Sequence, residues 1–137
     1  MDFYGHKINK LARYLTKDLN EKISSFGIYT SQWRIMLYLY KNKQCTQVEL
    51  SHKLCVEAPT VTRTLDRMKT MGLISRKEGK DKREKLIELT EKAYEMYPRL
   101  YEESNNIELK SLKDIDKEEL EIFDKVLEKM MKNLEGE

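Results

Sequence analysis

The segment from Thr46 to Arg83 constrains the fold more than any other part of this sequence. It predicts two short helices joined by a tight turn, because a capping signature at Thr46 precedes apolar residues at helical spacing. Pro59 suits the first turn of the second helix, where its missing N–H has no partner to lose, and Gly72 suits the end of that helix. A turn signal at 79–82 then predicts a β-hairpin. The order of these elements predicts a helix-turn-helix followed directly by a hairpin.

Further helices are predicted on both sides of this segment. Apolar residues recur every three or four positions over 5–25, and a second helix at about 31–42 is apolar on most sides, so we expect it to be buried. A long helix is predicted from about Thr90, where Pro98 should kink or interrupt it. A last helix is predicted from Asp116, which has a capping partner three residues later. The fold class is therefore mainly α with a small β-hairpin.

Composition and charge limit the classes of function. The 137 residues fit one domain with an ordinary core, and 36% charged against 39% hydrophobic residues are typical of a folded helical protein. We expect a cytoplasmic protein, because no apolar run approaches the roughly 20 residues that span a bilayer and the N-terminus lacks a signal-peptide core. Residues 1–43 carry eight Lys or Arg against three Asp or Glu, whereas residues 91–137 carry eight against fourteen. This asymmetry suits a face that binds a polyanion, although solvated helices also drift in charge.

The two short helices offer side chains that suit DNA. In the first we expect Val48, Leu50 and Leu54 to point inward, and in the second an apolar stripe at spacings of four and three faces the core. The other faces hold threonines and arginines. Arg bonds the guanine edge through two N–H groups, and a Thr methyl can touch the thymine methyl. An ordinary surface helix with the same residues is the alternative. The candidate DNA-binding residues of the two helices are Thr46, Gln47, Pro59, Thr60, Thr62, Arg63 and Arg67.

The hairpin, with strands predicted at 73–78 and 83–90, adds cations beside these helices. Flexible cations at a loop tip can reach phosphates or enter a narrow minor groove. Asp81 could orient Arg83 through a charge-assisted hydrogen bond. Many charged hairpins are only solvated, but the position directly after a helix-turn-helix favours contact with DNA. The candidate DNA-binding residues of the hairpin are Arg76, Lys80, Asp81, Lys82 and Arg83.

The chain resembles the MarR family of multiple-antibiotic-resistance-type regulators, and the match in order and spacing runs from about residue 5 to the end. The resemblance implies a winged helix-turn-helix homodimer that binds a pseudo-palindromic operator, with 59–63 as the major-groove readers. It assigns Asp81 and Arg83 to the wing motif and Arg76 to a basic position at the strand start. The segments that carry it are Ser31-Gln32-Trp33, Thr46-Gln47-Val48-Glu49-Leu50, Pro59-Thr60-Val61-Thr62-Arg63, Gly72-Leu73-Ile74-Ser75-Arg76, Asp81-Lys82-Arg83 and Leu89-Thr90.

The chain departs from the family at the start of the second short helix. It has Glu57-Ala58 where Ser or Asp is common in the family. Glu caps a helix less well than these residues, and a carboxylate there would weaken binding to phosphates.

Apolar stripes on the first and last helices predict a homodimer. A winged-helix core cannot cover both stripes, whereas the same helices of a second copy can, and a two-fold dimer sets its recognition helices roughly 34 Å apart, one turn of DNA. The alternative is that the two terminal helices pack on each other within one monomer. The single MarR-like domain, 1–137, then comprises a DNA-binding part at about 31–90 and dimerisation helices at 1–28 and 91–137. The predicted interface residues are Ile8, Leu11, Leu15, Leu120, Phe123, Leu127, Met130 and Leu134.

The resemblance also implies a small aromatic or hydrophobic effector. Aromatic side chains could line a cleft for it, with Arg13 or Arg34 pairing with a carboxylate, although the same aromatic side chains could simply fill the core and the interface. The candidate cleft residues are Tyr14, Tyr29, Trp33 and Tyr38.

The two cysteines, Cys45 and Cys55, leave a redox response open. A thiolate near a helix N-terminus can react with oxidants, but a small buried hydrophobe is the alternative. The peroxide-sensing branch of the family uses a cysteine in the first helix, and this chain has none before Cys45.

The sequence as a whole predicts a homodimeric, sequence-specific DNA-binding transcriptional regulator that acts as a ligand-responsive repressor. We expect no cofactor and no metal, and no enzyme, because no nucleophile with a base, catalytic carboxylate pair or metal-ligand set can be assembled. Two alternatives remain. One is a winged-helix module that serves protein partners without reading DNA sequence, and the other is a redox-responsive regulator that uses Cys45 or Cys55.

Overall fold

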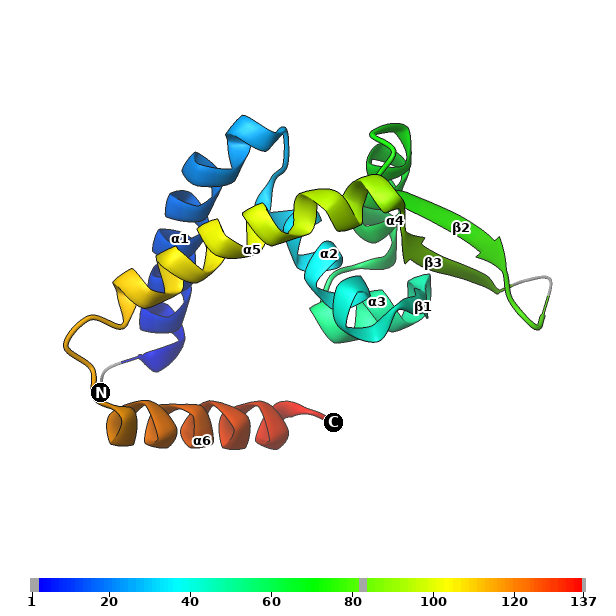
Figure 1. Cartoon of the computed structure of the whole chain (residues 1–137). Coiled ribbons are helices and arrows are strands. Elements are labelled where there is room, and N and C mark those ends of the chain that lie inside the picture. Colours follow the sequence, from blue (N-terminus) through cyan, green and yellow to red (C-terminus); the bar gives the residue numbers. More distant parts are fainter. Residues whose placement is uncertain (1–2, 82–83, 137) are drawn as a thin grey trace. The chain divides into compact units, whose positions relative to one another are not determined.

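The computed structural model describes residues 3–81 and 84–136 and is predominantly helical, as predicted (Figure 1). The chain divides into two compact units, Met1–Ile107 and Glu108–Glu137. The helical elements are α1 (Tyr4–Ile23), the 3-10 helix η1 (Ser24–Phe26), α2 (Thr30–Asn42), α3 (Gln47–Leu54), α4 (Ala58–Thr70), α5 (Glu91–Ser111) and α6 (Lys117–Leu134). The strands are β1 (Gln44–Thr46), β2 (Ile74–Glu78) and β3 (Lys85–Leu89).

Local capping signals set several helix ends where the sequence predicted them. The Thr46 side chain accepts a hydrogen bond from the backbone N–H of Glu49 at 3.1 Å and so begins α3. Gly72, at φ +76°, follows α4 in the left-handed conformation that glycine adopts without strain. Asp116 and Glu119 form a reciprocal capping box at the start of α6, with hydrogen bonds of 2.8 and 3.3 Å. Each of these ends is therefore set by residues that lie close to it in the sequence.

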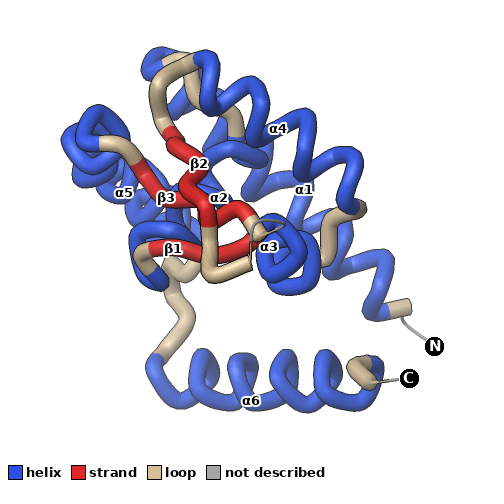
Figure 2. The backbone as a smooth tube through the Cα atoms, turned by 90° about the vertical axis from the view of Figure 1, so that its right-hand side faces the viewer, coloured by secondary structure: helices blue, strands red, loops and turns tan. Residues whose placement is uncertain are grey.

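The three strands form one antiparallel sheet in the order β1-β3-β2 (Figure 2). The hairpin β2–β3 was predicted, but β1 was not, because its three residues are too few to show an alternating pattern. On β3, Ile87 lies opposite Cys45 of β1 and Arg76 of β2. Since β1 leads directly into α3, the sheet fixes the start of the helix-turn-helix to the base of the hairpin.

The core of the first unit lies between α2, α4 and the sheet. The prediction that α2 is buried is confirmed, since both apolar and polar side chains of this helix are enclosed. The inward stripe of α4 is also confirmed. Its members and their main fully buried neighbours are Val61, Leu65, Met68, Trp33, Met36, Leu39, Leu50 and Ile87.

Two predictions about single residues are wrong. Val48 was expected to point inward, but its side chain is 71% exposed. Residues two apart on a helix face different sides, and in the eight-residue α3 the inward side belongs to Leu50. Pro98 was expected to kink or interrupt the long helix, and the interruption does not occur, since α5 runs from Glu91 to Ser111. Burial of Tyr97 and Leu100 on either side of the proline holds the helix despite the lost hydrogen bond.

Substitution of Leu50 and Val48 by alanine tests the orientation of α3. Leu50→Ala should lower the free energy of unfolding by about 2–5 kcal/mol, because it leaves a cavity in the core. Val48→Ala should change it by less than about 0.5 kcal/mol, since the side chain is exposed. Urea unfolding followed by circular dichroism measures both values. Equal losses in the two variants would contradict this orientation.

Candidate nucleic-acid interface

Helix α4 presents its polar face to solvent at its N-terminal half. Pro59, Thr60, Arg63 and Arg67 are exposed, on the sides of the helix away from its buried stripe. The Arg63 guanidinium donates a hydrogen bond from Nη2 to Thr60 Oγ1 at 3.2 Å, which holds the arginine near the first turn. The helix N-terminus also offers backbone N–H groups that attract anions. This end of α4 is therefore chemically suited to DNA, and its predicted contacts stay a prediction.

A second pair of predicted contact residues is engaged inside the protein. Gln47 Nε2 of α3 donates a short hydrogen bond to Thr62 Oγ1 of α4, and the Thr62 hydroxyl donates to the Ala58 carbonyl at 3.0 Å. Both side chains are half-buried. The geometry gives Gln47 and Thr62 a structural task, which is to hold the two helices of the motif together.

Arg76 also forms an internal contact. Its guanidinium Nη2 lies 2.9 Å from Asp66 Oδ1 on α4, and its side chain is only 16% exposed, whereas that of Asp66 is 61% exposed. The pair therefore joins β2 to the solvent side of α4. Across the hairpin, Lys77 pairs with Glu88 at 2.7 Å. Arg76 was predicted to contact DNA, but this geometry favours a role in holding the hairpin against α4.

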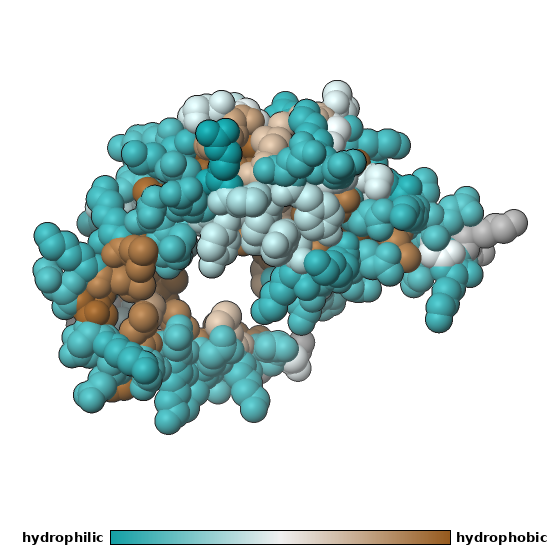
Figure 3. All heavy atoms as spheres, viewed as in Figure 1, coloured by the Kyte–Doolittle hydropathy of each residue, from teal (hydrophilic) through white to brown (hydrophobic). Residues whose placement is uncertain are grey.

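The tip of the hairpin is closed by backbone hydrogen bonds. Gly79 N–H donates to the Glu84 carbonyl at 2.9 Å, and Glu84 N–H donates to the Asp81 carbonyl at 2.9 Å. Lys80 is exposed at this tip, and hydrophilic side chains cover most of the hairpin on the face shown in Figure 3. The predicted contact residues Lys82 and Arg83 lie outside the described residues.

The predicted dimer residues form exposed or half-buried stripes on two helices. On α1, Ile8 and Leu11 are exposed and Leu15 is half-buried. Helix α6 has no buried residue among those described, and its apolar surface is wider than predicted, since Ile122 and Val126 are exposed as well. Of the predicted interface residues on α6, Phe123 and Leu134 are exposed. The half-buried ones are Leu120, Leu127 and Met130.

An aromatic cavity of about 710 Å³ lies between α2, the end of α3 and α5. Of the four predicted cleft residues, Tyr38 lines it. Trp33 is buried and packs against Tyr97 with ring centroids 5.2 Å apart, whereas Tyr14 and Tyr29 are exposed and do not line this cavity. The cavity thus includes one of the four predicted cleft residues, and the role of the other three in binding an effector stays a prediction.

Three other tyrosines line the aromatic cavity, and none of them was among the predicted cleft residues. Tyr40 of α2 stacks on Tyr97 of α5, with centroids 3.7 Å apart and planes 2° from parallel, and Tyr101 follows one turn later. Burial raises the pKa of Tyr97, with smaller contributions from Tyr40 and Tyr101. The Lys43 ammonium lies 5.4 Å above the Tyr40 ring. The spacing of the tyrosines on α5 was visible in the sequence, but their partner on α2 was not.

The two cysteines differ in their surroundings. Cys45 lies in β1, is 2% exposed, and has its pKa raised to about 12 by burial and, to a lesser degree, by the charge of Glu49. Cys55 is exposed in the turn between α3 and α4, at φ +51°. The buried neutral thiol of Cys45 opposes its use as a reactive thiolate, as the small-hydrophobe alternative predicted.

The described part of the chain contains neither a metal-ion cluster nor a membrane-spanning helix. No cluster of three or more His, Cys, Asp or Glu in residues 3–81 and 84–136 has the arrangement to hold a metal ion. No helix within the described part of the chain is long and apolar enough to cross a membrane.

Known proteins resemble this chain in sequence and in fold. The model of the MarR family matches residues 28–85. The uncharacterized HTH-type transcriptional regulator YwoH of Bacillus subtilis (strain 168) is 41% identical over 118 residues, which cover 86% of each chain. The crystal structure of the transcriptional regulator PA3341 has a TM-score of 0.90 and 28% identity, and the match covers 98% of this chain and all of that one. A MarR-family regulator from Listeria monocytogenes, crystallised with a 26mer DNA, has a TM-score of 0.92 at 24% identity over 98% of this chain and 90% of its own.

The two cysteines should react very differently with a thiol-alkylating reagent. In the native protein at pH 8, iodoacetamide should label Cys55 and leave Cys45 unmodified, because Cys45 is buried and keeps its proton up to a pH of about 12. Peptide mass spectrometry measures the site of labelling. Cys55→Ser should abolish native labelling, and denaturation in urea should restore one label at Cys45. Rapid native labelling of Cys45 would contradict the buried position of β1.

Proposed function

The chain belongs to the MarR family of transcriptional regulators, and from this premise we propose that it represses transcription by binding a pseudo-palindromic operator as a homodimer. The observation that carries the proposal is the exposed N-terminal half of α4, where Arg63 is held beside Thr60 at 3.2 Å. A second support is the likeness of fold to a Listeria monocytogenes MarR-family protein that was crystallised with DNA.

Each class of side chain has its own part in the proposed complex. Arg63 reads a base edge in the major groove, with a discrimination of about 1–3 kcal/mol if it makes a bidentate contact to guanine. Lys80 at the hairpin tip contacts a phosphate, which adds affinity without sequence preference. The internal pairs Arg76–Asp66 and Gln47–Thr62 hold the hairpin and α3 in fixed positions beside α4. Specificity and affinity thus come from different residues.

A DNA-binding titration tests this function. Wild-type protein should bind the duplex upstream of its own gene more tightly than a scrambled duplex, and its affinity should fall steeply with salt. Arg63→Ala should weaken binding to the upstream duplex by about 5- to 150-fold and leave binding to the scrambled duplex nearly unchanged. The matched control Arg99→Ala removes an exposed arginine of α5 and should retain wild-type affinity. Fluorescence anisotropy measures the DNA affinities of the wild-type protein and of both variants.

Two results of this titration would count against the proposal. Equal weak binding of wild-type protein to both duplexes would favour the winged-helix module that serves protein partners. Equal losses in Arg63→Ala and Arg99→Ala would show that only the total charge matters.

The proposed homodimer uses the exposed apolar stripes of α1 and α6. Isolated apolar residues are common on protein surfaces, but a continuous stripe over a whole helix marks an interface. On α6 the stripe runs from Leu120 to Leu134, and no described residue of this helix is buried. Two-fold pairing through these helices also supplies the two recognition helices that a pseudo-palindromic operator needs.

Charge introduced into the α6 stripe tests the dimer. Phe123→Glu and Leu127→Glu should each shift the protein from dimer to monomer in sedimentation equilibrium, because a carboxylate would be buried without a partner at the interface. The control Lys129→Glu places the same charge on an exposed polar position of α6 and should remain dimeric. Dimers of unchanged stability in all three variants would exclude α6 from the interface.

The proposed effector is a small aromatic acid that occupies the aromatic cavity. Tyr38 and Tyr101 line it beside the stacked rings of Tyr40 and Tyr97, and Arg34 at the same cavity offers a cation for a carboxylate. Because the cavity lies between α2 and α5, an occupant can favour one arrangement of these helices. It changes the affinity for DNA only to the extent that it binds the DNA-binding arrangement and the other arrangement with different affinities. Repetition of the DNA titration with an added hydroxybenzoate tests this, and unchanged DNA affinity up to millimolar ligand would argue against that class.

A further inference from the structure

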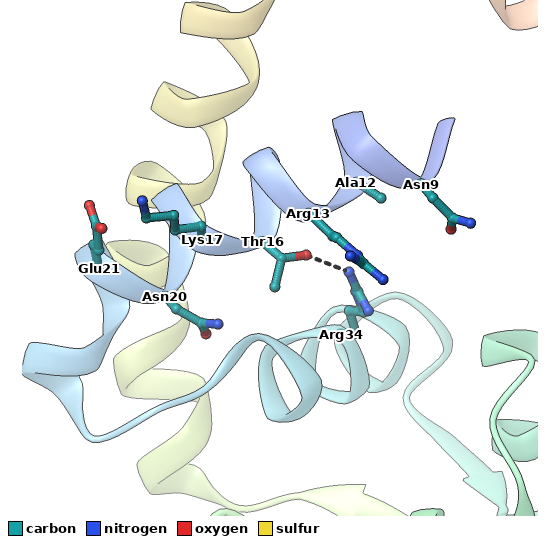
Figure 4. A pocket seen from close by; sticks show the side chains of 8 residues that line it. All are labelled: Asn9, Ala12, Arg13, Thr16, Lys17, Asn20, Glu21 and Arg34. Carbon is teal, nitrogen blue, oxygen red and sulfur yellow. Dashed lines mark hydrogen bonds between the residues drawn. The ribbon is translucent and has the colours of Figure 1, made fainter. Parts of the chain in front are cut away.

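A groove between α1 and α2 holds Arg13 and Lys17, which neither the proposed DNA-binding surface nor the aromatic cavity uses, together with Arg34, which also lines the aromatic cavity. Its volume is about 610 Å³, and most of its lining comes from α1, with Arg34 contributed by α2 (Figure 4). None of the described residues that line it is aromatic, so an aromatic ligand would find no ring to pack against.

Hydrogen-bond donors of the groove are oriented by bonds within the protein. Asn20 Oδ1 accepts from the Thr30 N–H at 2.8 Å and from the Thr30 hydroxyl at 2.7 Å. The remaining polar atom of that amide is Nδ2, which is a donor. Arg34 Nη2 donates to Thr16 Oγ1 at 3.3 Å, which draws the guanidinium toward α1. The groove is therefore rich in donors as well as in positive charge.

The groove holds three cations against one carboxylate, Glu21, among its described lining residues. Among residues 3–81 and 84–136, no ion pair joins Arg13, Lys17 or Arg34 to a carboxylate. In Figure 4 the Arg13 side chain reaches toward that of Arg34, whereas Glu21 lies toward the other end of the groove. Like charges that converge repel each other, and an anion between them would remove that repulsion.

The groove lies on a different face of α1 from the apolar stripe of the proposed dimer. Residues three or four apart share one face of a helix. The groove face carries Asn9, Arg13, Thr16 and Asn20. The stripe face carries Ile8, Leu11, Leu15 and Leu19. A second copy that covers the stripe therefore leaves the groove open to a small ligand.

We propose that this groove binds a compact oxyanion, either inorganic phosphate or the phosphate group of a small metabolite. Each guanidinium can bond two oxygens of a tetrahedral anion, whereas the Lys17 ammonium lies farther along the groove, near Glu21 (Figure 4). Asn20 Nδ2 and the Thr16 hydroxyl complete a set of neutral donors. The site differs from the aromatic cavity in both residues and chemistry, and Arg34 is the residue that they share.

Isothermal titration calorimetry of the full chain without DNA tests the proposal. One arm uses inorganic phosphate and a second uses glycerol 3-phosphate, both at an ionic strength held constant with chloride. Each arm should show saturable binding at one site per chain, and the tighter arm identifies the source of the phosphate group. Arg13→Gln and Arg34→Gln should each weaken binding about tenfold or more, because each removes charge-assisted hydrogen bonds. The control Lys7→Gln removes an exposed cation of α1 outside the groove and should stay within about twofold of wild type.

Three results would overturn the proposal. The first is heat of dilution only in both arms. The second is an equal loss in Lys7→Gln and Arg13→Gln, which would mean that general positive charge attracts the anion. The third is no anion binding together with altered sedimentation of Arg13→Gln, which would assign the groove to carboxylates of a second copy. Circular dichroism confirms that each variant is folded, and the absence of DNA makes the outcome independent of operator binding.

Discussion

Burial of one face of α4 is the constraint on which the rest of the DNA-binding part depends. Val61, Leu65 and Met68 are held in a close-packed core, and such cores tolerate little change of position. Since side chains on a helix turn by about 100° per residue, fixing this stripe also fixes which residues point outward. Thr60 and Arg63 are exposed for that reason, and their neighbours decide only how each side chain is oriented. The chemistry of the outer face thus follows from apolar packing on the inner one.

The end of α4 is joined just as firmly to the start of α5. The Thr90 hydroxyl donates to the Gly72 carbonyl at 2.6 Å, and the Lys92 ammonium donates to the Met71 carbonyl at 2.8 Å. These bonds satisfy carbonyls that a helix end leaves without partners. They also connect the recognition helix to α5, the helix that carries Tyr97 of the aromatic cavity. These hydrogen bonds give the proposed effector site on α5 a direct connection to the C-terminal end of α4.

The sequence predicted features that depend on local pattern and missed features that depend on distant partners. Helix ends and the inward face of α4 follow from capping residues and periodicity, so they were predicted. Strand β1 was missed because its partner β3 lies some forty residues later and three residues carry no pattern. The same limit applies to the candidate site. Arg76 reads as a DNA contact in sequence, and only the fold brings it to Asp66. Nothing in the sequence pairs Tyr97 with Tyr40, and only the fold stacks the two rings.

Pairing with a carboxylate distinguishes the cations that stabilise the fold from the cations that can bind a ligand. Arg76 and Lys77 each have a carboxylate within 2.9 Å, so their charges are compensated inside the protein. Arg63 makes only a neutral hydrogen bond to a hydroxyl, and a phosphate or a guanine can replace that partner with little loss. Arg13 and Arg34 converge without a carboxylate among the described residues. Net charge cannot make this distinction, because a paired and an unpaired arginine count equally, whereas the unpaired one has far more to gain from an anion.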